Sequence, residues 1–362
     1  MAPYGRVTKI SLKDLAWMKD WDCQSPSITG TRFGLELAQL AYDFKTEPWT
    51  RAGWTDIAIQ VDHRLLTGVG ALEEGGDWRQ LLLNSLVPRF ARRLKAFSNP
   101  ITQIKGLKDE SLLYDTGKAI TMLKPLTDGR YVVAIGFSGT GRRPQDWVSN
   151  TRFEHPDKLH TGFESLSELY NSNAQSIVFP TAARELGLEE LTLRDVLEEC
   201  HRENSRFILL LSGHSQGAAV LQIWAYKRLA EGLRPEYLSG MGFACPLVAS
   251  GMDPDQRACP LALFVNRDDV FTRLGLKEHL GQVWTFTPDE HFRQKSYSDV
   301  WENPLFQEML ATLNDIKNTR QALIILLGFL EALETVPRKE AGAALGHMIQ
   351  VMMAQRLLPL AE

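Results

Sequence analysis

The segment that most constrains the fold is an apolar run followed by a glycine-rich turn, at residues 207–220. Residues 207–211 read Phe-Ile-Leu-Leu-Leu, a pattern typical of a strand buried on both faces of a parallel sheet. Gly213, Ser215 and Gly217 form the turn, and the residues after it favour a helix. The sequence therefore predicts a strand, a sharp bend at Ser215 and a helix.

The spacing of these residues fits the G-x-S-x-G turn that presents a nucleophilic serine. A hydroxyl is a weak nucleophile, so it must be exposed and placed beside a base. A Cβ two positions before or after Ser215 would collide with neighbouring backbone, which explains Gly213 and Gly217. The positive end of the following helix stabilises a developing oxyanion. Ser215 is therefore the candidate nucleophile; because the bare motif also occurs by chance, a purely structural turn is the alternative.

Composition narrows the classes of function. The chain has 362 residues, 44% hydrophobic and 23% charged, which is ordinary for a globular protein with a large core. A formal net charge of -4 gives no electrostatic basis for binding nucleic acid. The N-terminal residues lack the apolar stretch of a secretion signal, and no run approaches the roughly 20 apolar residues of a membrane span. We therefore expect a cytoplasmic protein without a transmembrane segment, with leaderless export left open.

The cysteines carry no recognisable metal or redox motif. The four of them, at positions 23, 200, 245 and 259, are dispersed, and no two form a C-x-x-C pair. Four free thiols in a reducing compartment are the simplest interpretation. We expect neither a metal nor an organic cofactor.

The first half of the chain predicts a helix and a hairpin. Apolar residues at helical spacing predict a helix over residues 33–44, capped by Thr31 or a neighbour. Residues 118–123 and 131–137 are expected to pair as strands across a turn at Asp128 and Gly129.

The second half of the chain alternates strands with helices, which predicts an α/β fold with a largely parallel central sheet flanked by helices. Strands are expected at residues 207–211, 238–244, 261–265 and 282–286, and helices at 218–229, 300–316, 320–334 and 340–357. We expect a single domain over residues 1–362, with a core at about 33–297 and a helical C-terminal extension at about 298–362.

A serine hydrolase of this fold needs an acid and then a histidine, in that order after the serine. Asp268 and Asp269 follow the strand predicted at 261–265, at the end where parallel sheets bind ligands. Adjacent side chains diverge, so only one of the two carboxylates can face a histidine. The alternative is that both are solvated loop charges or caps.

Three histidines, His279, His291 and His347, follow these aspartates. His279 precedes the strand predicted at 282–286 and so lies near the wrong end of the sheet. His347 lies far along a C-terminal helix. His291 follows the strand, so order and strand geometry favour it as the base; the alternative is a surface histidine beside two acidic residues.

The oxyanion donors are expected to be backbone N–H groups. One belongs to the residue after the nucleophile, Gln216. The other is expected in the turn at residues 137–141, Phe-Ser-Gly-Thr-Gly, which ends a predicted strand. The alternative for this segment is an ordinary glycine turn.

Five segments in this order resemble the fungal-type (class 3) lipase family of α/β-hydrolases, over about residues 33–297. They are the A-x-L-A-Y-like helix at 36–42, F-S-G-T at 137–140 with Asp146-Trp147, H-T-G-F at 160–163, G-H-S-Q-G at 213–217, and N-R-D-D-V at 266–270 with Arg273-Leu274. The chain departs from the family's pattern at several positions, among them three that bear on the site: Ser138 replaces an arginine, His291 and Tyr297 are too far apart for the family's H-x-x-Y, and residues 141–159, where the family has an apolar lid, are mostly polar.

The resemblance implies an α/β-hydrolase fold and a carboxylic ester hydrolase without a cofactor. It implies Ser215 as nucleophile, Asp269 as acid and His291 as base. It also implies oxyanion N–H groups at Thr140 and Gln216, with the Thr140 hydroxyl as an additional donor. The implied substrate is an acylglycerol or another lipid ester, cleaved through an acyl-enzyme, with transient contact with a lipid surface. The alternatives are a soluble carboxylesterase, thioesterase or phospholipase, and a non-catalytic protein of the same fold that binds a ligand or partner.

Overall fold

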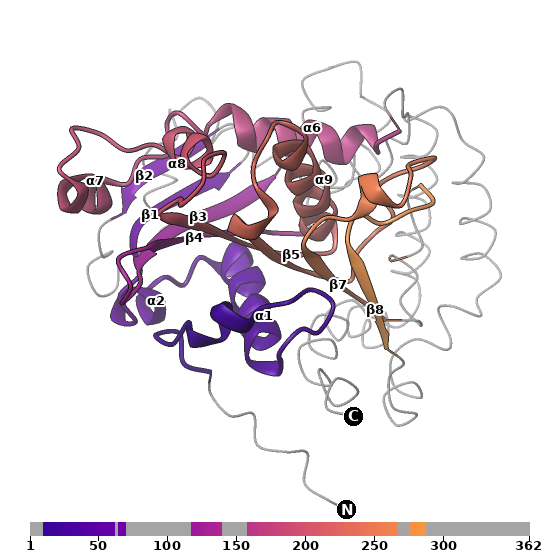
Figure 1. The fold of residues 1–362 in the computed structure, drawn as a ribbon, viewed down its shortest axis with the longest axis horizontal. Coiled ribbons are helices and arrows are strands. Elements are labelled where there is room, and N and C mark those ends of the chain that lie inside the picture. The colour runs from indigo at the N-terminus through magenta and orange to yellow at the C-terminus, as the bar shows by residue number, and fades with distance from the viewer. Residues whose placement is uncertain are drawn as a thin grey trace, which may run out of the picture.

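An eight-stranded sheet occupies the centre of the structure, a computed structural model that describes residues 10–61, 64–69, 117–139, 158–266, 272 and 276–286 (Figure 1). The strands lie side by side in the order β2-β1-β3-β4-β5-β6-β7-β8. Their bounds are β1 Thr55–Val61, β2 Arg64–Val69, β3 Lys118–Pro125, β4 Tyr131–Phe137, β5 Phe207–His214, β6 Leu238–Phe243, β7 Leu261–Asn266 and β8 Gln282–Phe286.

The two halves of the sheet differ in strand direction. Strands β2, β1, β3 and β4 pair antiparallel, whereas β4 to β8 pair parallel throughout. The predicted hairpin is confirmed: β3 and β4 join at Asp128 and Gly129, and Gly129 has the positive φ of 83° that favours glycine. Because β4 to β8 are parallel, their carboxyl ends lie at one edge of the sheet.

Helices cover both faces of the sheet, so the predicted α/β class with a largely parallel sheet is confirmed. Figure 1 shows α1 on one face and α6 and α9 on the other, and α9 packs against both β5 and α6. The helices are α1 Ile28–Asp43, α2 Glu47–Arg51, α6 Thr161–Ser172, α7 Pro180–Leu186, α8 Leu193–Glu199 and α9 Gln216–Ala230, with short 3-10 turns η1 Ala16–Asp20, η5 Pro235–Tyr237 and η6 Asp255–Arg257. Among the helices in the described ranges, none has the length and apolarity needed to cross a bilayer.

Strand β5 separates two hydrophobic cores, and this explains its unbroken apolar sequence. Leu209 and Leu211 pack in the core that contains α6 and α9. Leu210, on the opposite face, packs in the core that contains α1. All eight residues of β5 are buried, since alternate side chains of a strand point to opposite faces and both faces are covered.

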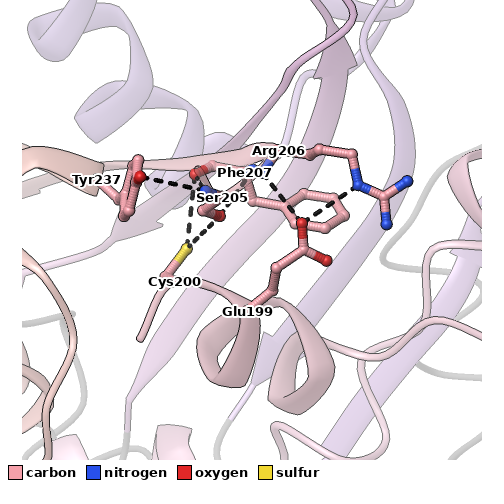
Figure 2. A network of polar contacts seen from close by, with 6 residues as sticks. All are labelled: Glu199, Cys200, Ser205, Arg206, Phe207 and Tyr237. Atoms are coloured by element: carbon pink, nitrogen blue, oxygen red, sulfur yellow. Dashed lines mark hydrogen bonds and ion pairs between the residues drawn. The ribbon is translucent and has the colours of Figure 1, made fainter. Parts of the chain in front are cut away.

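A polar network fixes the amino end of β5 (Figure 2). The Ser205 N–H donates to the Tyr237 hydroxyl at 3.1 Å, and the Ser205 Oγ accepts from the Phe207 N–H at 3.0 Å. The Cys200 thiol donates to the Phe207 carbonyl, with Sγ and O 3.6 Å apart. The Arg206 N–H donates to the Glu199 carboxylate at 3.0 Å. These contacts join α8, η5 and the first residue of β5, so they set where the strand begins.

Helix α1 begins earlier than residue 33, and its cap is Ser27 rather than Thr31. The Ser27 Oγ accepts from the Gly30 N–H at 3.1 Å, and the Thr31 hydroxyl donates to the Ser27 carbonyl at 2.9 Å. Gly30 is tolerated inside the helix because an added Cβ would lie 2.7 Å from the Trp17 ring. Close packing on that ring outweighs the low helix propensity of glycine. The helices predicted at 300–357 lie outside the described residues.

We expect Ser205→Ala to lower the free energy of unfolding by about 1–3 kcal/mol, because it leaves the buried Phe207 N–H without this acceptor. Chemical denaturation monitored by fluorescence measures the loss. Ser165→Ala is the matched control, since the Ser165 hydroxyl donates to the Thr161 carbonyl within α6. Equal stabilities for the two variants would contradict the anchoring role of Ser205.

Candidate active site

Ser215 occupies a strained backbone conformation at the junction of β5 and α9. Its φ of 55° and ψ of -123° lie in a region that residues with a side chain rarely adopt. The Ser215 N–H donates to the Phe243 carbonyl at 2.8 Å, and the Ser215 carbonyl accepts from the Ala218 and Ala219 N–H groups at 2.9 and 3.1 Å. Ser215 is partly exposed in an otherwise buried segment. The bend therefore leaves Ser215 more exposed than its neighbours at the end of the sheet, as the sequence predicts.

The two glycines of the motif are required by close backbone contacts. A Cβ added at Gly213 would lie 2.5 Å from the Gly217 carbonyl oxygen. One added at Gly217 would overlap the Phe137 carbonyl oxygen and lie 2.6 Å from that of Ser138. Real Cβ atoms do not approach backbone this closely, so only glycine fits. The first turn of α9 is thus pressed against both the end of β5 and the end of β4.

The segment after β4 touches Ser215 directly. A Cβ added at Gly139 would overlap the Tyr42 hydroxyl and lie 2.6 Å from the His214 carbonyl and 3.1 Å from the Ser215 Cβ. Ser138 and Gly139 are both buried. The structure therefore brings the predicted oxyanion segment against the serine. Thr140, the predicted donor, is the next residue and lies outside the described residues.

Gln216 is the first residue of α9, so its N–H lies at the positive end of the helix dipole. Its side chain is buried. Lys227 and Arg228 lie in the last turn of the same helix, where positive charge complements the negative end of the dipole. The helix therefore has the polarity that stabilises negative charge beside Ser215.

Strands β7 and β8 run parallel to β5 and end at the same edge. Phe243 of β6 pairs with Phe264 of β7, and Asn266 of β7 pairs with Phe286 of β8. The chain therefore leaves both strands at the edge where Ser215 lies. The predicted acids Asp268 and Asp269 follow β7 and the predicted base His291 follows β8, but all three lie outside the described residues.

His279 lies before β8, as its position in the sequence predicts. Its ring donates a hydrogen bond to the Pro246 backbone, and among the described residues its Nδ1 has no hydrogen-bond partner. Burial lowers the pKa of His279 to about 4, well below the value near neutrality that suits a general base. These contacts connect His279 to the loop after β6.

Sequence analysis assigns no role to Tyr42 or His214, yet both lie at the bend. The Tyr42 hydroxyl and the His214 Nδ1 are 2.8 Å apart. Burial without an ion pair lowers the pKa of His214 to about 4. Two features of the sequence point to these residues: Tyr42 ends the 36–42 segment, and His214 directly precedes the serine. Neither feature predicts that the two side chains form a hydrogen bond.

Two clefts lined by described residues lie away from Ser215. One, of about 720 Å³, is lined by Ile208, Leu238 and Pro260, near the amino ends of β5, β6 and β7. Another, of about 560 Å³, is lined by Cys259, Pro260 and Gln282, near the amino ends of β7 and β8. Both therefore lie near the edge opposite the serine. Within the described ranges, no group of three or more His, Cys, Asp or Glu side chains could hold a metal ion, and all four cysteines are free thiols.

Comparison with known proteins finds no matching family model, no matching curated protein and no matching solved structure. The functional interpretation therefore depends on the sequence motifs and on the geometry around Ser215.

We expect Gly217→Ala to lower the free energy of unfolding by about 3 kcal/mol or more, because the added methyl group meets two backbone carbonyls that cannot rotate away. Gly187→Ala is the control: no atom lies within 4 Å of a Cβ added at Gly187, so this variant makes no close contact, although its φ of 69° adds a conformational cost that Gly217, inside α9, does not have. The free energy of unfolding of Gly187→Ala should fall by only about 1 kcal/mol, which is the cost of placing a residue with a Cβ in a left-handed conformation. Urea denaturation measures both; equal losses would contradict the contact with β4.

The pKa of His214 predicts an acid-sensitive fold. Its folded-state pKa of about 4 is lower than its ordinary value of 6.5, so the unfolded chain takes up this proton first as the pH falls. The free energy of unfolding should therefore decrease between about pH 6.5 and pH 4, by on the order of 3 kcal/mol from this histidine. Denaturation of the wild type and of His214→Asn across this range measures it. The free energy of unfolding of His214→Asn should depend less steeply on pH than that of the wild type. The same slope for both proteins would contradict a His214 ring that is buried and neutral.

Proposed function

We propose that the protein is a serine hydrolase that cleaves carboxylic esters, with Ser215 as nucleophile in an α/β-hydrolase arrangement. The observation that carries the proposal is the backbone of Ser215, with φ 55° and ψ -123° between a buried strand and a helix. Such strain costs on the order of 1–3 kcal/mol and is retained mainly where a site requires it. Here it places a partly exposed serine at the start of a helix.

The remaining triad members proposed are Asp269 and His291. Support comes from the direction of β7 and β8, which end at the edge where Ser215 lies, and from the class 3 lipase-like motifs. In the proposed reaction the Ser215 Oγ attacks the ester carbonyl carbon while His291 takes its proton, and Asp269 stabilises the resulting imidazolium. The ester C–O bond then breaks, and the alcohol leaves with the proton from His291. Water attacks the acyl-enzyme in the same way and releases the carboxylic acid.

The proposed oxyanion hole consists of the N–H groups of Gln216 and Thr140. Gln216 begins α9, where the helix dipole favours negative charge. Gly139, which precedes Thr140, lies against the Ser215 Cβ. The donors are thus expected on both sides of the attacked carbonyl, and losing one such donor typically costs about 10²–10³ in rate.

The proposed substrate is an acylglycerol or another lipid ester, on the strength of the resemblance to class 3 lipases. The alternative substrates are soluble carboxylic esters, thioesters and phospholipids, which the same three residues would cleave by the same chemistry. Residues 141–159 are mostly polar where lipases have an apolar lid, which favours catalysis without activation at a lipid surface. Chain-length profiles on p-nitrophenyl esters, emulsified triacylglycerol and phospholipid vesicles distinguish these substrates.

We expect a fluorophosphonate probe to label the wild type covalently and to leave Ser215→Ala unlabelled, because the probe reacts only with an activated serine. Ser165→Ala, on α6, is the control and should label like the wild type. Mass spectrometry of the labelled peptide identifies the modified residue. A correctly folded wild-type protein that takes up no label would identify a binding protein of this fold and exclude the hydrolase.

A further inference from the structure

The Tyr42 hydroxyl connects three separate parts of the site. Tyr42 comes from the last turn of α1, which covers the sheet face opposite α9. Its hydroxyl lies 2.8 Å from the Nδ1 of His214, the residue before the serine. The Gly139 backbone, after β4, hydrogen-bonds to the same oxygen. One hydroxyl therefore joins a helix, the end of β5 and the segment after β4.

One arrangement of protons uses the Tyr42 hydroxyl as both acceptor and donor. The Gly139 N–H donates to the Tyr42 oxygen, and the Tyr42 O–H donates to the His214 Nδ1 when the imidazole proton is on Nε2. This arrangement requires a neutral imidazole that carries its proton on Nε2. Burial of His214 keeps the ring neutral, since it lowers the pKa to about 4. Burial also raises the pKa of the Tyr42 hydroxyl, which therefore keeps the proton that it donates.

The chain of hydrogen bonds determines where Gly139 lies. An added Cβ at Gly139 would overlap the Tyr42 hydroxyl, so the hydroxyl and the Gly139 backbone are in direct contact. The same Cβ would lie 3.1 Å from the Ser215 Cβ. A small shift of Gly139 therefore changes the spacing between Ser215 and the next residue, Thr140, whose N–H is the proposed oxyanion donor.

We propose that Tyr42 is a positioning residue that holds the 139–140 backbone at the distance from Ser215 that oxyanion stabilisation requires. The inference rests on the proposed hydrolase function and adds a residue to it. Tyr42 does not contact the substrate; it acts through Gly139 and His214. Preorganised donors stabilise a transition state only if they are held in place before the reaction, and a displacement of about 1 Å can cost 10²-fold in rate.

The test is steady-state kinetics of Tyr42→Phe on a soluble p-nitrophenyl ester. The variant keeps the ring and removes only the hydroxyl. We expect kcat to fall by about 10- to 100-fold while KM stays within about twofold, because the lost interaction acts on the transition state.

The matched control is Tyr170→Phe. Tyr170 is buried in α6, and its hydroxyl makes a 2.7 Å hydrogen bond to the Thr121 hydroxyl of β3. This variant therefore also removes one tyrosine hydroxyl and its hydrogen bond, but the bond joins α6 to β3 and involves neither His214 nor Gly139. It should lose stability with a kcat close to that of the wild type.

A second pair of variants keeps the test decisive where Tyr42→Phe folds poorly. His214→Asn offers an amide oxygen as an acceptor near the position of Nδ1, whereas His214→Leu has a similar size and no acceptor. We expect His214→Asn to retain more of kcat than His214→Leu, with similar KM values.

The outcomes separate the inference from the proposed function. Loss of activity in Ser215→Ala with an unchanged kcat in Tyr42→Phe would overturn the positioning role and leave the hydrolase intact. A fall in kcat of the same size in Tyr42→Phe and Tyr170→Phe would overturn it as well, since a general structural effect would then explain both. Full activity in Ser215→Ala would overturn the proposed function itself.

Discussion

The candidate site depends on one backbone contact, between Gly217 at the start of α9 and the carbonyl oxygens of Phe137 and Ser138 at the end of β4. The space at Gly217 admits a hydrogen atom and no carbon. That contact draws the end of β4, the bend at Ser215 and the positive end of α9 to one point. A charge that develops there would meet backbone donors fixed by the fold, rather than side chains that must be ordered first.

The surroundings of β5 hold the strained bend. The strand is buried along its full length between two cores, and its amino end is fixed by the Ser205 network. At its carboxyl end, the Ser215 N–H is held by Phe243 of the neighbouring strand. Strain of a few kcal/mol persists only where packing and hydrogen bonds on every side oppose its relaxation. The site is therefore a property of the sheet rather than of the five-residue motif.

Sequence patterns predicted the parts of the fold that local interactions control. The apolar run before Ser215, the Asp128–Gly129 hairpin and the β8 strand follow directly from periodicity and turn chemistry. The start of α1 was misplaced because the Trp17 ring, distant in the pattern, makes Gly30 acceptable inside a helix. The contacts of Tyr42 are beyond sequence prediction for a similar reason: its partners are about 100 and 172 residues away in the chain, and no local signal reports such contacts.

The hydrogen bond from the Ser215 N–H to the Phe243 carbonyl also orders events during synthesis of the chain. Phe243 is the last residue of β6, so a growing polypeptide that has emerged only as far as α9 lacks the acceptor that completes the bend. The complete bend can therefore form only after β6 has joined the sheet. A nascent or truncated chain that ends before this strand carries the whole motif but lacks the hydrogen bond that holds Ser215 in place.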